Sequence, residues 1–394
     1  MSLIPYGRQC IDAGDIRAVA RVLRSAWLTQ GPMVPKFEEA FAKYCGSRYA
    51  VAVSSGTAGL HLAALAVGLK VGDEAVTTPL SFVATSNAVL YCGAKPVFAD
   101  IDKNSLGLDP KKAKAKFCSK TKAIFNVHFA GQPNVLAAKK FFSKRRDFVR
   151  IDDACHALGA EIKVAAQWKK IGGLNEVDAS VFSFHPVKHI TTGEGGMVTT
   201  DRKDIYEKLL LLRSHGIERG VARFRNKKSE KGTWYYEMQV LGLNYRITDI
   251  QCALGISQLR KIKANVARRR EIAAFYDKAF SSVEGLKTPA KIEGTRSSYH
   301  LYALRIDFRS IGMTRTRFME LLRGEGIATQ VHYIPITQQP YYLENGLSSQ
   351  MPVAEDFYKE ALSIPMFAAL KDLEMRQVVS AVKKIIRSYN SHVA

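Results

Sequence analysis

The chain has few cysteines, and none of them stands in a metal-binding pattern. Six cysteines occur among 394 residues, without a CxxC pair or another spacing typical of zinc ligands. This argues against a zinc-stabilised protein and against a disulfide scaffold. Free thiols are typical of a reducing compartment, so we expect a cytoplasmic protein without a resident metal.

Long apolar runs are also missing. No stretch approaches the roughly 20 apolar residues that a membrane-spanning helix needs. The N-terminus, MSLIPYGRQC, has no basic segment followed by an apolar one, which a secretory signal would require. The sequence therefore predicts neither a membrane anchor nor a signal peptide.

Acidic residues are scarce relative to basic ones. The 36 Asp and Glu are outnumbered by 58 Lys and Arg, which gives a formal net charge of +22. Such an excess attracts either nucleic acid or anionic small molecules. The basic residues are spread along the chain and are not interleaved with aromatics in a stacking pattern, so we expect no nucleic-acid partner. A non-catalytic, nucleic-acid-binding protein remains the alternative that this charge supports.

Short β-rich runs alternate with helical patterns from about residue 48. Strands are predicted at 49–53, 74–79, 95–102, 122–129 and 147–153, and helices at 57–69, 81–93 (opened by Ser81), 109–117 and 134–145. This alternation is typical of an α/β fold, with a mostly parallel central sheet and helices on both faces. In such sheets ligands bind at the carboxyl ends of the strands.

The chain is too long for one ordinary core. We place residues 1–246 in an N-terminal segment and a large domain. A long helical stretch at 247–281 opens the remainder, 247–394, where mixed strands and helices predict a smaller α+β C-terminal domain. The polar segment 216–237 is long for a passive connection, which indicates an irregular loop that is either mobile or functional.

One lysine stands between a predicted strand and a glycine-rich turn in VFSFHPVKHITTGEGG, residues 181–196. Lys188 either lies on the surface or points into a cleft. In a cleft, partial burial lowers the pKa of the amine and makes it a usable nucleophile. Taken alone, the residue favours the surface interpretation.

Two further segments carry candidate functional residues. Asp152 and Asp153 end a strand in RIDDACHALGA; one could cap a following helix, which the pair alone favours, and the other could face a buried cation such as a protonated ring nitrogen. In SSGTAGLH, residues 54–61, small residues between a strand and a helix offer free N–H groups to a phosphate. The alternative there is a tight turn with a helix N-cap, and neither a GxxxxGK[ST] loop nor a GxGxxG fingerprint is present.

Together these three segments predict a pyridoxal 5'-phosphate (PLP) site. This cofactor needs a phosphate anchor, an acidic partner for its pyridine nitrogen and a lysine that forms a Schiff base with it. The three occur in that order on the loops of one predicted parallel sheet. The aspartate would keep the ring protonated, and Lys188 would transfer the proton of the substrate Cα.

The motifs that carry these residues identify a family resemblance. The chain resembles the DegT/DnrJ/StrS group of sugar-nucleotide aminotransferases in segments that run in order along nearly its whole length: WLTQGPMVPKFE, SSGTAGL, TTPLSFVATSNAV, DDACHALGA, SFHPVKHITTGEGG, RSHGI and GLNYRITDIQCALG. The resemblance implies the type I fold of PLP-dependent aminotransferases, which is that of aspartate aminotransferase. It also implies a homodimer with sites at the subunit interface.

The resemblance assigns roles to individual positions. Lys188 would carry the cofactor, Asp153 would pair with the pyridine nitrogen, and His156 would lie beside the ring, where many relatives have glutamine. Phe82 would stack on the ring. The phosphate would be held by Gly56, Thr57, Ala58 and Ser183, and by Asn244 of the partner subunit. The nucleotide sugar would contact Tyr6, Thr29, Gln30 and His332. Packing roles are the alternative for Phe82, Tyr6 and His332, and an ordinary turn residue is the alternative for Asn244.

The implied reaction is a transamination in two halves. L-glutamate is the expected amino donor. The amino group would then pass to C4 of a UDP-linked 4-keto-6-deoxy-N-acetylhexosamine, as in pseudaminic acid biosynthesis. Perosamine-type or arabinose-type 4-amination and 3-amination use the same machinery and remain alternatives. Members of the group with histidine in place of the lysine catalyse dehydration, which Lys188 disfavours here.

Overall fold

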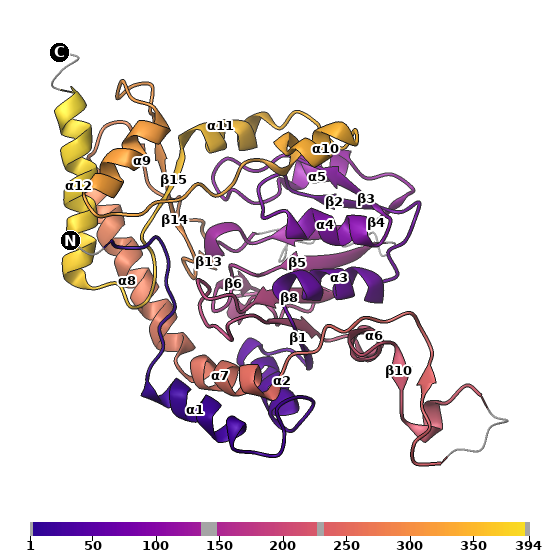
Figure 1. Ribbon diagram of the computed structural model, residues 1–394. Helices are drawn as coiled ribbons and strands as arrows, with labels where there is room; N and C mark the ends of the chain where they lie inside the picture. Colours follow the sequence, from indigo (N-terminus) through magenta and orange to yellow (C-terminus); the bar gives the residue numbers. More distant parts are fainter. Residues whose placement is uncertain (1–2, 135–147, 227–231, 391–394) are drawn as a thin grey trace.

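The computed structural model describes residues 3–134, 148–226 and 232–390 (Figure 1). The helix predicted at 134–145 therefore lies outside the described residues, except for Asn134. Most other predicted elements are present within a few residues of their expected bounds.

A seven-stranded sheet forms the centre of the large domain (Figure 1). In spatial order its strands are β1 (Tyr49–Val53), β9 (Gly196–Thr200), β8 (Ala179–Ser183), β5 (Val149–Asp153), β4 (Thr121–Val127), β2 (Glu74–Thr77) and β3 (Lys95–Phe98). Strand β9 is antiparallel to both its neighbours, and the remaining pairs are parallel. The predicted mostly parallel sheet is confirmed.

Successive strand residues pack on opposite faces of this sheet. In β1, Val51 and Val53 join one buried cluster, whereas Ala50 and Ala52 join another, because side chains alternate along a strand. The first cluster is covered by α3 (Gly56–Ala66), α4 (Ala84–Tyr91) and α6 (Lys203–Arg213). The second is covered by α2 (Met33–Cys45) and α7 (Asp249–Arg260). No helix of the described residues is both long enough and apolar enough to span a membrane.

The helical stretch predicted at 247–281 is divided into two helices. Helix α7 ends at Arg260, and α8 (Ile262–Phe280) begins after Lys261. The Lys261 amine forms ion pairs with Asp12 at 2.8 Å and Asp15 at 2.6 Å. These carboxylates form the capping box of α1 (Ala13–Leu23), so the junction of α7 and α8 also fixes the start of α1.

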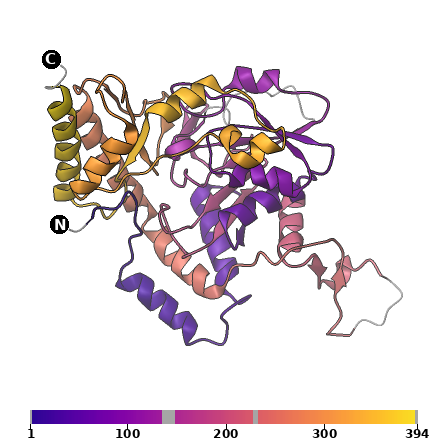
Figure 2. The ribbon, with the colours of Figure 1, turned by 45° about the horizontal axis from the view of Figure 1, so that its top comes forward.

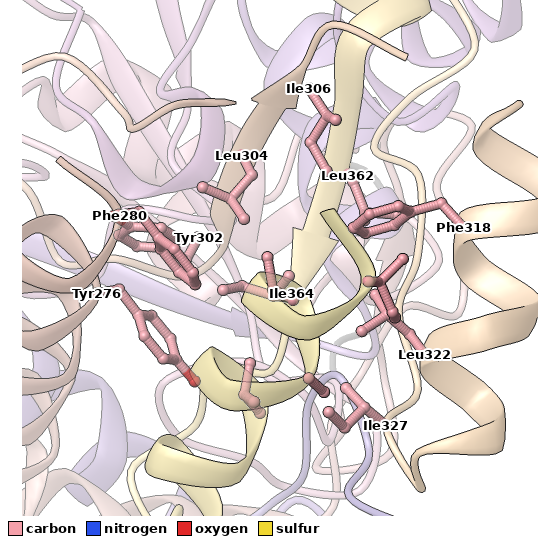
Figure 3. Packing of buried hydrophobic residues seen from close by; sticks show 14 of the residues in the cluster. Tyr276, Phe280, Tyr302, Leu304, Ile306, Phe318, Leu322, Ile327, Leu362 and Ile364 are labelled. Carbon is pink, nitrogen blue, oxygen red and sulfur yellow. The ribbon is translucent and has the colours of Figure 1, made fainter. Parts of the chain in front are cut away.

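The C-terminal region has a core of its own (Figure 3). Its elements are β12 (Leu286–Lys287), β14 (Tyr302–Ile306), α9 (Arg315–Gly324), β15 (Ala361–Ile364) and α12 (Asp372–Asn390). Ile4 packs into this core and pairs with Ile327, so the N-terminal segment reaches the C-terminal sheet. The domain boundary at 246/247 stays a prediction.

Several smaller elements were not predicted. They are α10 (Pro340–Glu344), α11 (Pro352–Glu360), β6 (Glu161–Val164), β7 (Gln167–Lys170), β13 (Thr295–Arg296), β10 (Ile217–Glu218), β11 (Glu237–Met238) and the short helices η1 (Phe129–Gly131), η4 (Val221–Arg223) and η5 (Ile336–Gln338). The helix predicted at 109–117 is present as α5 (Pro110–Ala115). Strands β10 and β11 pair within the segment predicted as an irregular loop, and both ribbon views show this arm projecting from the body (Figures 1 and 2).

The start of α4 differs from the prediction. The helix begins at Ala84, and no side chain caps it. The Ser81 hydroxyl lies 2.7 Å from the hydroxyl of Thr85, so Ser81 contacts the first turn from outside the helix. This contact directs the residues before α4 toward the carboxyl end of β5.

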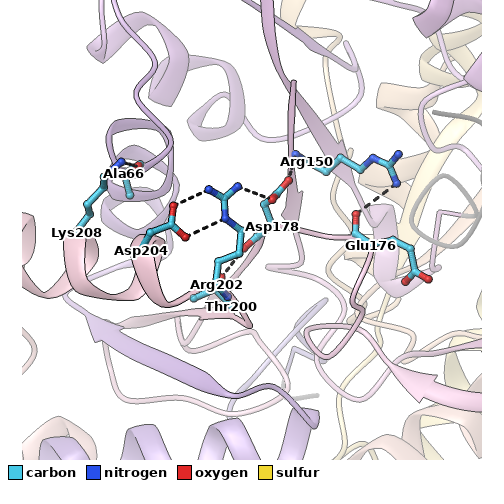
Figure 4. A network of polar contacts seen from close by, with 8 residues as sticks. All are labelled: Ala66, Arg150, Glu176, Asp178, Thr200, Arg202, Asp204 and Lys208. Atoms are coloured by element: carbon cyan, nitrogen blue, oxygen red, sulfur yellow. Dashed lines mark hydrogen bonds and ion pairs between the residues drawn. The ribbon is translucent and has the colours of Figure 1, made fainter. Parts of the chain in front are cut away.

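A polar network ties the sheet together at the start of β8 (Figure 4). Arg202 donates to Asp178 at 2.8 Å and to Asp204 at 2.6 Å. The second carboxylate oxygen of Asp178 accepts the backbone N–H of Arg150 at 2.8 Å, and the Thr200 hydroxyl donates to the Asp178 carbonyl at 2.6 Å. The network joins β5, β8, β9 and α6, and so holds in register the strands that deliver the functional residues at the opposite edge.

The close packing of α3 on β8 gives a stability test. A methyl group at Gly59 would lie 2.7 Å from Val181 Cγ1, so Gly59→Ala should lower the free energy of unfolding by about 1–3 kcal/mol. Alanine at an open helical position stabilises instead, by about 1 kcal/mol. Gly324→Ala in α9 is the control, because a methyl group there meets nothing within 4 Å. Thermal and denaturant unfolding of both variants measure the difference; equal stabilisation by both would contradict the packing.

Candidate active site

A cavity of about 560 Å³ lies at the carboxyl ends of β5 and β8. Its walls include the first turn of α3 and the segment 330–333, which leads toward the C-terminal sheet. Nine of the predicted site residues line it: Tyr6, Gly56, Thr57, Phe82, Asp153, His156, Ser183, Lys188 and His332. The structure thus brings together residues that are up to 326 positions apart (from 6 to 332) in the sequence.

The other predicted site residues lie elsewhere. The Ala58 N–H donates to the Ser55 hydroxyl at 3.0 Å. Thr29 pairs with Thr248, Gln30 lines a second cavity, and Asn244 pairs with Ser214. Thr29, Gln30 and Asn244 do not line the cavity of Lys188 in this chain, so their assignment to phosphate and sugar stays a prediction.

The first turn of α3 lies against the ends of two strands. A Cβ atom on Gly56 would come within 2.9 Å of Ser183 Cβ, and one on Gly196 within 2.6 Å of the Ser55 carbonyl oxygen. Only glycine permits this approach of α3 to β8 and β9. The helix therefore directs its N-terminal N–H groups and the positive end of its dipole to the cavity edge, where an anion is stabilised.

Asp153 is held by two donors at the end of β5. Its Oδ2 accepts the Thr85 hydroxyl at 2.6 Å, and its Oδ1 accepts the Cys155 N–H at 3.1 Å. The prediction that an aspartate of this pair caps a helix is wrong, because the next element is β6. Asp152 points to the other side of the strand, where it accepts from Asn126 at 3.0 Å and lies 2.9 Å from His128 Nε2.

Lys188 lies in the cavity and not on the surface. Burial lowers the pKa of its amine, although the nearby Cys155 and Asp153 oppose this shift. Its Nζ is 3.4 Å from His300 Nε2. The amine therefore has an imidazole neighbour, and it is closer to its neutral form than an exposed lysine would be.

Histidine rings surround this amine. The rings of His156 and His300 are 4.2 Å apart, and His156 Nε2 lies 3.3 Å from the Tyr333 hydroxyl. Burial lowers the pKa of both histidines well below the ordinary value, so both are neutral near pH 7. His332 Nδ1 lies 2.9 Å from the Ser363 hydroxyl. Within the described ranges, no three His, Cys, Asp or Glu side chains are arranged to hold a metal ion.

Sequence reasoning missed four residues of the site: Thr85, Cys155, His300 and Tyr333. Thr85 and Cys155 lie within quoted motifs, whereas His300 and Tyr333 do not, and the partners of Thr85, His300 and Tyr333 are distant in the chain. The Thr85 contact with Asp153 spans 68 positions, and the His300 contact with Lys188 spans 112. Sequence periodicity and short motif spacings cannot predict contacts between segments so far apart in the chain.

The fold is the type I fold of PLP-dependent sugar aminotransferases. The chain belongs to the DegT/DnrJ/EryC1/StrS aminotransferase family, whose pattern matches residues 9–383. The resemblance drawn from the sequence motifs is therefore confirmed. The chain is a sugar aminotransferase.

Individual relatives match along nearly the whole chain. A Campylobacter jejuni protein named UDP-4-amino-4,6-dideoxy-N-acetyl-beta-L-altrosamine transaminase is 39% identical over 394 residues, covering 98% of this chain and 100% of the relative. The structure of PseC from Helicobacter pylori, an aminotransferase involved in the biosynthesis of pseudoaminic acid, matches with a TM-score of 0.89 at 34% identity, covering 98% and 100% of the two chains. The PLP-form of Spr1654 from Streptococcus pneumoniae matches with a TM-score of 0.86 at 26% identity, covering 98% and 99%.

Burial of the site histidines predicts a pH dependence of stability. Burial lowers the pKa of His332 to about 4 from 6.5. Between these values the unfolded chain binds a proton that the folded chain does not, so the free energy of unfolding falls as the pH falls below about 6.5. His332→Gln should reduce this fall by about 1 kcal/mol per pH unit. Urea unfolding at pH 7 and pH 5 measures it. Gln330, which lines the same cavity and does not titrate, supplies the control: Gln330→Ala should leave the fall unchanged, and an equal effect of both variants would contradict the prediction.

Proposed function

We propose that this sugar aminotransferase uses PLP to transfer an amino group from L-glutamate to C4 of a UDP-linked 4-keto-6-deoxy-N-acetylhexosamine. The product would be a 4-amino sugar for pseudaminic acid biosynthesis. The observation that carries the proposal is the common cavity of Lys188, Asp153 and the first turn of α3. The names of the Campylobacter and Helicobacter relatives support the choice of sugar.

The residues present fit the cofactor. The absence of a Cβ at Gly56 leaves the first turn of α3 in contact with Ser183, and Gly56, Thr57, Ala58 and Ser183 are our candidates to hold the phosphate. Asp153 would meet the ring nitrogen, and Lys188 would bind the aldehyde carbon. When bound, PLP supplies an electron sink that stabilises the carbanion formed at the substrate carbon.

The chain's own residues have separable roles in this proposal. The Thr85 hydroxyl and the Cys155 N–H orient the Asp153 carboxylate, and a carboxylate held in this way favours a protonated ring nitrogen. Lys188 would hold and move the substrate proton as a partly desolvated amine. His156 would lie beside the ring, with its Nε2 3.3 Å from the Tyr333 hydroxyl.

Substrate contacts are proposed in two groups. Tyr6, Phe82 and His332 line the cavity, so each is available to a sugar or to the ring. The Phe82 side chain is exposed, and Tyr6 and His332 have ring centroids 5.5 Å apart. Thr29, Gln30 and Asn244 are proposed to act at the cavity of a partner subunit in a homodimer. We propose a cytoplasmic location because the nucleotide-sugar substrate is expected there.

The first experiment follows the colour of the PLP-loaded protein. Addition of L-glutamate should bleach the visible absorption band, because the lysine-bound form is consumed in the first half-reaction. Addition of the UDP-linked 4-keto-6-deoxy-N-acetylhexosamine should restore it. The control uses keto-sugars of the perosamine and 3-amino types. If the band returns only with one of these sugars, the protein is still an aminotransferase but its substrate is that sugar. If L-glutamate does not bleach the band, L-glutamate is not the amino donor.

Site variants test the roles of the cavity residues. Lys188→Ala should lose the visible band and turnover. Asp153→Asn should bind PLP and lose most turnover, by roughly 10²–10⁴-fold as for other acid–base groups. Thr85→Val keeps the carboxylate but removes one of its donors, so its loss should be smaller. Spectra and steady-state rates of the three variants measure the relative losses of cofactor binding and turnover. Lys203→Ala, on the surface of α6, is the control. Wild-type turnover by Lys188→Ala would end the assignment.

A further inference from the structure

Arg269 of α8 is a buried cation, and removing a cation from water is energetically unfavourable. Its side chain is 2% exposed, and burial lowers the pKa of the guanidinium to about 10. Among the residues that the structure describes, no carboxylate lies within ion-pair distance of it. It donates instead to three carbonyls, those of Tyr299 and His300 at 3.2 Å each and that of Met366 at 2.8 Å. Because a buried charge without an ionic partner is unfavourable, the position calls for a functional explanation.

Two of these carbonyls belong to a loop of residues 297–300 that has little conformational freedom. Tyr299 has a φ of 46°, a left-handed conformation that is strained for a bulky residue. The loop is held from several sides. Arg270 donates to the Ser297 carbonyl at 2.9 Å, His189 Nε2 lies 3.1 Å from the Ser298 carbonyl, and the Ser298 hydroxyl donates to the His156 carbonyl at 3.2 Å. Arg269 adds the contacts at the end of the loop that carries His300.

The loop presents His300 to the reactive amine. The residue is 4% exposed, and its Nε2 is 3.4 Å from Lys188 Nζ. Its other ring nitrogen, Nδ1, is buried and has no hydrogen-bond partner within the described part of the chain. Among the residues that the structure describes, the ring of His300 therefore has one polar contact, the one with Lys188.

We propose that His300 is a further catalytic residue, which accepts a hydrogen bond from the Lys188 amine and orients its lone pair toward the cavity, and that Arg269 is the positioning residue that holds His300 in place. The inference rests on the proposed function of Lys188 as the cofactor-binding amine. Neither residue was among the sequence-based candidates.

The choice of an imidazole partner has a chemical reason. A carboxylate beside Lys188 would stabilise the ammonium form, which has no lone pair and cannot attack a carbonyl. A neutral imidazole accepts one N–H of a neutral amine and leaves the lone pair free to face the cavity. The carboxylate that is present, Asp153, is already bound by Thr85 and by the Cys155 N–H.

The charged and titratable groups around the amine agree with this role. Those that influence it or are influenced by it are Asp153, Cys155, His156, His189, Arg269, His300 and His332. Burial keeps all four histidines neutral near pH 7, and the cationic Arg269 further disfavours the ammonium form of Lys188. Lys188 should therefore react as a free amine at a lower pH than surface lysines do.

The test measures the amine itself in the cofactor-free protein. Brief labelling with trace acetic anhydride across a pH series, followed by peptide mass spectrometry, gives the reactivity of Lys188 relative to that of exposed Lys203 in the same sample. In the wild type, Lys188 should reach full reactivity at a lower pH than Lys203. At high pH, where the amine is neutral with or without the imidazole, His300→Phe should lower the reactivity of Lys188 by about tenfold, because the amine loses the acceptor that orients it.

The role of Arg269 is separated from its charge by paired variants. At high pH, where the charge of Arg269 no longer decides the protonation of Lys188, Arg269→Met should reduce Lys188 reactivity in the wild-type background and have a much smaller effect in the His300→Phe background, because it acts through His300. Arg269→Lys, which keeps a charged donor, should recover part of the loss. Arg268→Met on the same helix is the control. If Arg269→Met does not fold, Arg269→Lys alone should still lower the reactivity of Lys188 at high pH, because the lysine cannot reproduce all three contacts of Arg269 with the carbonyls.

Two outcomes would overturn the proposal. Unchanged labelling of Lys188 in His300→Phe would show that His300 has no catalytic role. Equal effects of Arg269→Met in both backgrounds would show that Arg269 does not act through His300. The labelling uses no cofactor, so failure of the proposed function itself is detected separately, as a wild-type protein that gains no visible band on addition of PLP.

Discussion

The burial of one amine, that of Lys188, is the constraint on which the rest of the site depends. A lysine in a cavity is stable only if its surroundings either neutralise its charge or favour its neutral form. Here the nearest polar side-chain contact is the His300 imidazole, and the carboxylate of the cavity is bound to other donors. Burial therefore favours the neutral form of this amine, which is the form that a reaction that makes and breaks carbon–nitrogen bonds requires.

The architecture supplies this environment from three independent parts of the chain. The strands β5 and β8 end at the same edge of the sheet and deliver Asp153 and the segment of Lys188. The first turn of α3 approaches that edge only because Gly56 and Gly196 lack side chains. The loop of residues 297–300, held by α8, closes the cavity from the side of the C-terminal region. A shift of any one part by a few tenths of an ångström would alter the neighbours of the amine.

The sequence predicted the parts of this arrangement that depend on local pattern. Strand and helix alternation predicted the sheet, and the motifs predicted Lys188, Asp153 and the turn before α3, all of which line one cavity or flank it. It did not predict the small hairpins, because two-residue strands such as β10 carry no measurable periodicity. It missed His300 and Thr85, whose contacts join distant segments. It assigned a capping role to the Asp152–Asp153 pair because the alternation suggested a helix where the chain instead turns into β6.

Three predicted site residues, Thr29, Gln30 and Asn244, do not line the cavity. They raise the question of whether one site is built from two chains. Asn244 lies beyond an arm that exposes unusually large apolar side chains, with Leu241 83%, Trp234 71% and Met238 61% exposed. Apolar surface of this kind is typical of an interface with another protein. A second copy that covered the arm would bury these side chains. The exposed arm therefore supports the proposed homodimer, because its apolar side chains have no cover in a single chain. The proposed contribution of Asn244 to a partner's phosphate site depends on the same homodimer.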